Sequence, residues 1–319
     1  MKASILIPAF NASEFIEETL KSCLNQGEGC IAEIIVVDDH STDAMGAVVG
    51  AIAERTPSIP IHLVQNPSKG ACSARNHALS LAQGEAIQWL DADDLLGPGK
   101  LQAQLALLRE HPEHLIASKW RRFAGSLDNL WPEEQGNWSS VPEYSSPRDW
   151  LLSERMMIPV GWLGTRKLFQ TIQPWDESLL INQDGEYFTR AIAASAGVIF
   201  EPESRVYYRS SVPGSVSHFK PEKAPSLFRA AGSFEKTVLT LGEDTALKTL
   251  ISNHYQGFIY RVYPLVPDLR KVARTKIQQY GTPTRVNDVA ESRFAKLFCW
   301  LFGWKLLVQL RLLRDRIQS

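Results

Sequence analysis

Three carboxylates stand close together in the sequence, at Asp91, Asp93 and Asp94, directly after an apolar stretch that ends in Trp89 and Leu90. Carboxylates held a few ångströms apart raise one another's pKa unless a cation neutralises them, and hard divalent ions such as Mg²⁺ and Mn²⁺ take oxygen ligands of this kind. A solvated acidic turn is the alternative. The apolar stretch favours a site, because ligands of open α/β sheets collect beyond the carboxyl ends of buried strands.

The acidic cluster offers few ligands to such an ion. An EF-hand loop counted from Asp91 would need an oxygen ligand, glycine and glutamate where the chain has Leu95, Leu96 and Gln102. A divalent ion held by one or two carboxylates usually completes its shell with water and substrate phosphates. The sequence therefore predicts Mn²⁺ or Mg²⁺ as the cofactor and a phosphorylated substrate.

The first hundred residues alternate between strand and helix patterns, and these elements must position the cluster. Short apolar or β-branched runs predict strands at 3–8, 34–37, 61–64 and 86–90. Helical patterns fill the connections: one helix capped by Asn11, one ending near Arg55, one over 71–83, and one opening at Pro98. Because crossovers between such strands are right-handed, the pattern predicts an α/β fold with a doubly wound, mostly parallel sheet flanked by helices.

Composition argues against several classes of protein. The chain has 319 residues and a net charge of -1, which does not favour general binding of nucleic acid. Its four cysteines show neither Cys-x-x-Cys pairing nor zinc spacing, so we expect free thiols in a reducing cytoplasm. The N-terminal apolar stretch is too short for a signal peptide. The absence of Gly-x-Gly-x-x-Gly and P-loop motifs argues against a dinucleotide dehydrogenase and a P-loop enzyme.

Two further carboxylates, Asp38 and Asp39, end the second predicted strand. Acidic residues at strand ends of related sheets receive a ribose hydroxyl, so both are candidates for contact with a nucleotide base or ribose. An Asx turn or a helix cap is the alternative interpretation, and it applies to Asp43 as well.

Four motifs in order carry a resemblance to a known family. Residues 8–11 (PAFN), 37–43 (VDDHSTD), 70–76 (GACSARN) and 90–94 (LDADD) resemble the ordered signature of the family 2 glycosyltransferases, which often have glycine in place of His40. The resemblance implies a GT-A fold, in which a nucleotide-sugar half precedes an acceptor half. It implies that the nucleotide sugar is bound by Pro8, Ala9, Phe10, Asp38, Asp39, Ser41, Arg75, Asn76, Asp91, Ala92 and Asp93, and the metal by Asp91, Asp93 and Asp94.

The second half of the chain supplies a candidate base. Residues 183–188 (QDGEYF) resemble the Glu-Asp catalytic motif of the family, with Gln183 in place of the glutamate. The resemblance implies that Asp184 is the catalytic base. Glu186 is a weaker candidate, because a carboxylate at the start of a helix also stabilises the N-terminal dipole. Arg209 and His218 resemble residues of the family's closing segment, with a diphosphate contact or a surface role as the two interpretations.

Sugar transfer then sets the expected mechanism. The acceptor hydroxyl is a poor nucleophile, so a carboxylate takes its proton as it attacks the donor from the face opposite the leaving group. We expect an inverting, metal-dependent transferase that moves a sugar from a nucleotide-sugar donor, UDP-linked, to a hydroxyl of a glycan or lipid-linked acceptor in polysaccharide biosynthesis. The alternatives are a sugar-phosphate nucleotidyltransferase and a non-catalytic nucleotide-sugar-binding partner in a glycan assembly complex.

The last part of the chain has a different character. Helices are predicted at 227–241 and 245–262, and a basic, aromatic-rich stretch follows at 293–316. Its longest uncharged run, 297–304, falls well short of the ~20 residues that span a bilayer. Such a helix either lies in a membrane interface or packs on the domain or on a second subunit, forming a homo-oligomer. We expect a GT-A domain over 1–225, with halves 1–100 and 101–225, a helical extension over 226–319, and a cytoplasmic or peripheral location.

Overall fold

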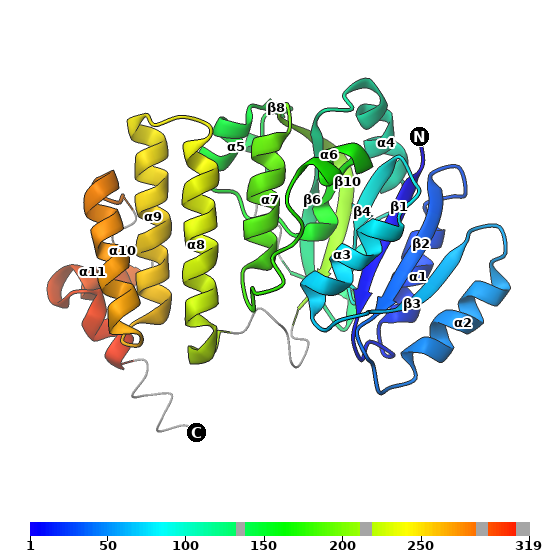
Figure 1. Ribbon diagram of the computed structural model, residues 1–319, viewed down its shortest axis with the longest axis horizontal. Coiled ribbons are helices and arrows are strands. Elements are labelled where there is room, and N and C mark those ends of the chain that lie inside the picture. The colour runs from blue at the N-terminus through cyan, green and yellow to red at the C-terminus, as the bar shows by residue number, and fades with distance from the viewer. Residues whose placement is uncertain (132–137, 211–218, 285–292, 311–319) are drawn as a thin grey trace. The chain divides into compact units, whose positions relative to one another are not determined.

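The computed structural model describes residues 1–131, 138–210, 219–284 and 293–310. The chain divides into two compact units, Met1–Leu179 with Gln183–Val216 and Leu180–Asn182 with Ser217–Ser319. The first unit contains a large sheet, and the described elements of the second unit are helices (Figure 1). The domain boundary predicted at residue 225 stays a prediction.

In the first unit, the described residues form one ten-stranded sheet with helices packed against it (Figure 1). The strand order is β3-β2-β1-β4-β9-β6-β10-β5, with β7 beside β6 and β8 beside β10. The strands are β1 (Ala3–Ala9), β2 (Ile31–Asp38), β3 (Ile61–Gln65), β4 (Ala86–Trp89), β5 (Leu95–Leu96), β6 (Leu115–Ala124), β7 (Ser126–Leu130), β8 (Tyr144–Ser145), β9 (Trp162–Thr165) and β10 (Val198–Arg209). The helices are α1 (Ile16–Leu24), α2 (Met45–Arg55), α3 (Ala71–Leu81), α4 (Lys100–Glu110), α5 (Pro147–Leu152), α6 (Arg166–Thr171) and α7 (Gln183–Ala194).

The sheet is parallel in its first half and mixed in its second. Strands β3, β2, β1 and β4 pair in parallel, and β1 and β2 are buried over most of their length, as expected of parallel strands covered on both faces. Strand β9 then pairs antiparallel with both β4 and β6, whereas β6 and β10 are parallel. The predicted α/β fold with a doubly wound sheet flanked by helices is confirmed; its continuous parallel part is the half before residue 90, and β6 with β10 adds one further parallel pair.

Two predicted helix starts are wrong. Asn11 does not cap α1, which begins only at Ile16; its backbone has φ +46, and its side chain accepts the N–H of Thr42 instead. Pro98 lies two residues before the start of α4, because Gly99 takes the N-cap position with φ +70. The four cysteines are free thiols, as predicted.

The second unit contains α8 (Ala224–Leu239), α9 (Thr245–Val262), α10 (Pro267–Tyr280) and α11 (Arg293–Phe302), and α9 packs against both α8 and α10 (Figure 1). Glu235 joins these three helices: it accepts hydrogen bonds from the hydroxyls of Tyr255 and Tyr280 and from Lys276 Nζ (2.7 Å). Helix α11 stops at Gly303, which has φ +78, and residues 304–310 continue as a separate helical segment. The described helices include none with the length and apolar character needed to cross a membrane.

Candidate active site

The candidate site lies where β1, β2 and β4 end. Because the three strands are parallel neighbours, their carboxyl ends reach the same edge of the sheet. Ala9 stands opposite Asp38, and Leu90 donates its backbone N–H to the carbonyl of Leu6 (3.0 Å). The sheet therefore brings the motifs at 8–11, 37–43 and 90–94 to one place.

Hydrogen bonds join the loops that follow β1 and β2. The Asn11 N–H donates to Ser41 Oγ (2.9 Å), and Asn11 Oδ1 accepts from the Thr42 N–H (2.8 Å). Ser13 donates its N–H to Asp43 (2.8 Å). His40 has φ +65, in the left-handed region that glycine adopts without strain, which gives a physical reason for glycine at this position in the family.

The two carboxylates at the end of β2 bind amides. Asp38 accepts the N–H of Ser41 (2.8 Å), which is the Asx turn considered above. Asp39 accepts the N–H of Gly70 with both oxygens (3.0 and 2.9 Å) and the side-chain amide of Asn66 (2.7 Å). Both residues therefore shape the loops around the site, and their contacts with a base or ribose stay predictions.

Arg75, on α3, joins separate parts of the site. Its guanidinium pairs with Asp91 (2.8 Å), lies 3.8 Å from an Asp184 oxygen and donates to Gln183 Oε1 (3.3 Å). It also lies over the Trp175 ring, 4.6 Å from the centroid. Burial alone would lower the pKa of Arg75, but Asp91 and Asp184 raise it above its usual value, so the guanidinium stays charged. Arg75 thus gathers the acidic motif and the candidate base around one cation.

The three clustered aspartates have different surroundings. Asp94 is fully buried; one of its oxygens accepts the backbone N–H of Arg209 (2.9 Å), and the other has no hydrogen-bond partner in the described chain. Burial, and then Asp93 and Asp91, raise the pKa of Asp94 well above its usual value, which favours the neutral acid. These surroundings set Asp94 apart from Asp91 and Asp93, and its role as a metal ligand stays a prediction. Across the described residues, no three His, Cys, Asp or Glu side chains are grouped to hold an ion.

Asp91 and Asp93 nevertheless fit a divalent cation. Burial raises the pKa of Asp93 to about 6, and Asp91 adds to the rise. Asp93 makes no ion pair with a described residue, so its charge remains available to a cation. Mg²⁺ and Mn²⁺ are commonly held by one or two carboxylates together with water and substrate phosphates, which matches this small set of ligands. The identity of the cofactor stays a prediction.

Arg209 ends β10 as a buried structural residue. Its guanidinium donates to the carbonyls of Asp93 (2.9 Å) and Gly125 (2.6 Å) and pairs with Glu18 (2.5 Å). Only 4% of the side chain is exposed. The structure does not support the predicted contact with a diphosphate, because all three guanidinium nitrogens already donate within the protein. His218 lies outside the described residues.

Helix α7 begins at Gln183, close to where the sequence predicts it, and places its two carboxylates differently. Asp184 keeps 42% of its side chain exposed beside Arg75. Partial desolvation by the surrounding chain raises its pKa to about 6, although Arg75 opposes the rise, and Asp91 adds to it. Glu186 is 5% exposed and pairs with Arg190 through both oxygens (2.7 and 2.8 Å). Asp184 is therefore open to a substrate, whereas both carboxylate oxygens of Glu186 are bound by Arg190.

Asn76 holds the turn that precedes α7. Its side-chain amide donates to the Trp175 carbonyl (3.0 Å) and to Glu177 (2.9 Å), and its Oδ1 accepts the Trp175 N–H (2.8 Å). Trp175 in turn stacks on Tyr187 of α7, with ring centroids 4.0 Å apart. Asn76 therefore positions the segment that carries Asp184, and its contact with a nucleotide sugar stays a prediction.

The remaining predicted residues lie at the ends of β1 and β4. Pro8 and Ala9 belong to β1, and Phe10 follows it with 60% of its surface exposed, so the ring is available to a flat ligand. Ala92 is buried, and its carbonyl accepts a hydrogen bond from Thr19 Oγ1 (2.9 Å). The roles assigned to these residues in binding stay predictions.

Sequence reasoning missed an aromatic group around Arg122 of β6. The Arg122 guanidinium lies 5.6 Å from the ring centroids of Trp120 and Tyr208 and 5.9 Å from that of Trp131. Tyr208 stands close to the acidic cluster: burial raises its pKa to about 12, and the three aspartates add to the rise. Trp120 and Arg122 lie two residues apart in one strand. The group forms only because β6 pairs with β10, which sets Tyr208 opposite Arg122.

Comparison with known proteins adds evidence of relationship. The family model described as glycosyl transferase family 2 matches residues 4–173. The amylovoran biosynthesis glycosyltransferase AmsB of Erwinia amylovora is 40% identical over 121 residues, which are 38% of each chain. A GalNAc(5)-diNAcBac-PP-undecaprenol beta-1,3-glucosyltransferase of Campylobacter jejuni is 31% identical over 153 residues, which are 48% of each chain. The chain thus matches less than half the length of these two relatives.

A solved structure has a similar fold. Residues 1–349 of TarS from S. aureus, determined in complex with UDP, share 18% sequence identity at a TM-score of 0.65, over 88% of this chain and 89% of that one. This likeness supports the arrangement of a central sheet, flanking helices and a helical C-terminal part. Because the family model covers more than half of the chain, the chain belongs to glycosyl transferase family 2, and it has the GT-A fold.

Proposed function

We propose that the protein is an inverting, metal-dependent glycosyltransferase that moves a sugar from a UDP-linked donor to a hydroxyl of a glycan or lipid-linked acceptor. The observation that carries the proposal is the position of Arg75. One guanidinium nitrogen lies 2.8 Å from Asp91, in the acidic motif, and 3.8 Å from Asp184, at the start of α7. Asp91, which suits a donor phosphate site, and Asp184, which suits proton transfer, therefore lie within one site.

Asp184 is the proposed base. An acceptor hydroxyl needs a proton acceptor as it attacks the donor, and a base works best when its pKa lies near the pH of the reaction. The pKa of Asp184, raised to about 6, leaves it ionised at neutral pH while keeping it more basic than an ordinary aspartate. Attack from the side opposite the leaving group needs no covalent intermediate, so the configuration of the sugar is inverted.

Asp93 and Asp91 are the proposed ligands of Mn²⁺ or Mg²⁺. Such an ion, when bound, would neutralise negative charge on the leaving diphosphate. Arg75 would hold Asp91 in place until the donor arrives, and Phe10, 60% exposed at the end of β1, would offer its ring to the nucleotide base.

The choice of donor and acceptor rests on relatives and on the aromatic group around Arg122. One TarS structure is described as a complex with UDP-GlcNAc, and the Campylobacter relative is named for a PP-undecaprenol substrate. In this chain, Trp131, 39% exposed, and the half-buried Tyr208 offer ring faces on which sugars pack, and Arg122 offers a cation for an acidic group. We propose that this group contacts the acceptor.

Calorimetric titration with UDP, in Mn²⁺ and in EDTA, tests the donor site. We expect binding that depends on Mn²⁺ in the unmodified protein, and weak, metal-independent binding in Asp93→Ala. Asp268→Ala, which removes an exposed aspartate of α10, is the matched control and should bind UDP as the unmodified protein does. Equal affinity in both buffers for the unmodified protein would refute the metal requirement.

Turnover separates the transferase from the non-catalytic alternative. A transferase should slowly hydrolyse its UDP-sugar without an acceptor, whereas a binding partner would hold the nucleotide sugar unchanged. A panel of UDP-sugars, followed by release of UDP, distinguishes the two. Tight binding with no UDP released from any of them would favour the non-catalytic alternative.

A further inference from the structure

The C-terminal helical unit exposes a cluster of large apolar side chains. Trp300 is 77% exposed, Phe302 60%, Leu301 56% and Leu297 54%, all on α11. The following helical segment adds Leu306 and Leu310. Leu297, Trp300 and Leu301 share one face of α11 by their i, i+3 and i+4 spacing, whereas Phe302 packs on Phe298 with ring centroids 5.0 Å apart. Single exposed apolar residues are ordinary on soluble proteins, but a contiguous group of this kind marks a surface that another body covers.

This outer apolar face is not needed to attach α11 to the rest of its unit. The attachment uses the opposite side, where Ala295 and Cys299 are buried against Trp304 and Leu307. Trp304 then packs edge-on against Tyr260, with ring centroids 4.7 Å apart. The helix is therefore apolar on two sides, one used in the fold and one left open.

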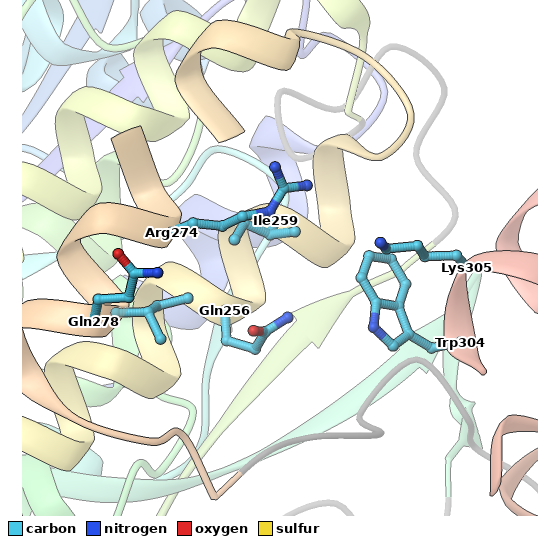
Figure 2. A pocket seen from close by; sticks show the side chains of 7 residues that line it. Gln256, Ile259, Arg274, Gln278, Trp304 and Lys305 are labelled. Carbon is cyan, nitrogen blue, oxygen red and sulfur yellow. The ribbon is translucent and has the colours of Figure 1, made fainter. Parts of the chain in front are cut away.

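A pocket of about 320 Å³ lies in the same unit and takes two of its lining residues from the helical segment that follows α11 (Figure 2). Its lining comes from three segments: Gln256 and Ile259 of α9, Arg274, Ile277 and Gln278 of α10, and Trp304 with Lys305. Figure 2 shows the Trp304 and Lys305 side chains across the pocket from those of α10. Apolar walls, two cations and two side-chain amides suit a phosphate that is attached to an apolar body, and the lining contributed by the described residues includes no acidic side chain.

The charge of the surrounding sequence is mostly positive. Residues 293–310 include three basic side chains and no acidic one. Helix α10 includes four basic side chains and one acidic one, Asp268. Arg274 makes no ion pair with any described residue, so its charge is available. A positive surface with exposed aromatic rings complements an anionic bilayer, whereas a second copy of the same surface would be repelled.

We propose that this face of the second unit docks on an anionic lipid bilayer, with Leu297 and Trp300 in the interface and a lipid phosphate in the pocket between Arg274 and Lys305. Tryptophan is favoured at the depth of lipid headgroups, and basic side chains beside it hold the phosphates. The docking needs neither donor nor acceptor. Its success or failure is therefore independent of the proposed transferase activity.

Cosedimentation of the full chain with vesicles tests this proposal. We expect binding to vesicles of phosphatidylcholine mixed with phosphatidylglycerol, little binding to phosphatidylcholine alone, and weaker binding as salt rises. Leu297→Ser combined with Trp300→Ser should lower the partition coefficient by about tenfold or more. Met156→Ser, a change of an equally exposed apolar side chain in the first unit, is the control and should not alter binding.

A second pair of variants isolates the pocket. Arg274→Glu should weaken binding to the anionic vesicles several-fold more than Lys271→Glu, because both lie exposed on α10 but only Arg274 lines the pocket. Circular dichroism verifies that each variant is folded. Equal effects of these two changes would overturn the phosphate site. Failure of the unmodified protein to bind anionic vesicles would overturn the proposal. It would do so even if sedimentation showed a dimer formed through this face, or if the pocket bound only soluble glycerol phosphate.

Discussion

Asp184→Asn and Glu186→Gln are matched changes two residues apart on α7, and we expect them to affect different properties. Asparagine keeps the size of Asp184, and Arg75 keeps its 2.8 Å contact with Asp91, so the donor site should survive. Asparagine cannot accept the proton of an acceptor hydroxyl. Transfer should therefore fall by about 10²-fold or more, the usual effect of losing a general base, while UDP affinity is retained.

The same pair should differ in stability. The pKa of Asp184 is raised to about 6 in the fold, so its ionised form is disfavoured relative to the unfolded chain. The resulting loss of folding stability begins as pH rises above the ordinary aspartate pKa and is complete above pH 6 or so, the pKa of Asp184 in the fold being about 6. Asp184→Asn removes this loss, so Tm at neutral pH should be unchanged or higher. Glu186→Gln breaks a charge-assisted pair that is 5% exposed on the Glu186 side. Its cost of about 1.5–3 kcal/mol should lower Tm by roughly 3–10 °C.

Three measurements on both variants decide the matter: transfer rate with a suitable acceptor, UDP affinity by calorimetry, and thermal unfolding. The reasoning is refuted if Glu186→Gln is the inactive variant and Asp184→Asn remains active, since the wrong carboxylate would then have been chosen. Loss of UDP binding in both variants would show that the start of α7 is structural and carries no base.

Further predictions concern the cation, the second unit and the loop after β2. Arg75→Met should move the acidic limb of the transfer rate to higher pH by about one unit, because a positive charge 3.8 Å from Asp184 stabilises its ionised form by ~1–2 kcal/mol in a largely hydrated site and so lowers its pKa; an unmoved limb would contradict the assignment of Asp184. Glu235→Gln should destabilise the protein to denaturant by about 1.5–3 kcal/mol, whereas Glu243→Gln, in an exposed pair with Lys248, should change stability by less than about 0.5 kcal/mol. Burial raises the pKa of Glu235, but hydrogen bonds from Lys276 and two tyrosines outweigh it and lower the pKa. The stabilisation that Glu235 gives the fold should therefore be lost as pH falls through that pKa. A stability difference between Glu235→Gln and the unmodified protein that persists in acid would count against this role. His40→Ala should be less stable than His40→Gly by about 1 kcal/mol in thermal unfolding, because both lose the ring contact with Ser68 but only alanine is strained at φ +65.

The local patterns of the sequence predicted much of the fold. Helix α9 runs from Thr245 to Val262, as predicted, because Asp244 caps its first turn by accepting the N–H groups of Ala246 (2.8 Å) and Leu247 (3.2 Å). Strand β9 was not predicted. Its four residues carry no strong pattern of their own, and they form a strand only because β4 and β6 lie on either side.

The acidic cluster shows where sequence reasoning about the site ends. Its three aspartates look alike in sequence, but Asp94 turns inward because the backbone of Arg209, 115 residues away, supplies an N–H to it. The Arg209 guanidinium itself donates to the carbonyls of Asp93 and Gly125, so it is not free for the phosphate contact that the sequence suggested. Spacing along the chain identified the motifs, whereas the distribution of roles within them depends on contacts between distant strands.

The hydrogen bonds between the loops after β1 and β2 have a consequence for how a nucleotide is selected. Asn11, Ser41, Thr42 and Asp43 already hold one another, so these loops lose little conformational entropy when a ligand arrives. A pair of loops held in this way would discriminate between bases by excluding those that do not fit, because it cannot rearrange to accommodate them. Selection of the nucleotide would then be expressed in how long a ligand stays, with association governed by diffusion and charge for correct and incorrect nucleotides alike.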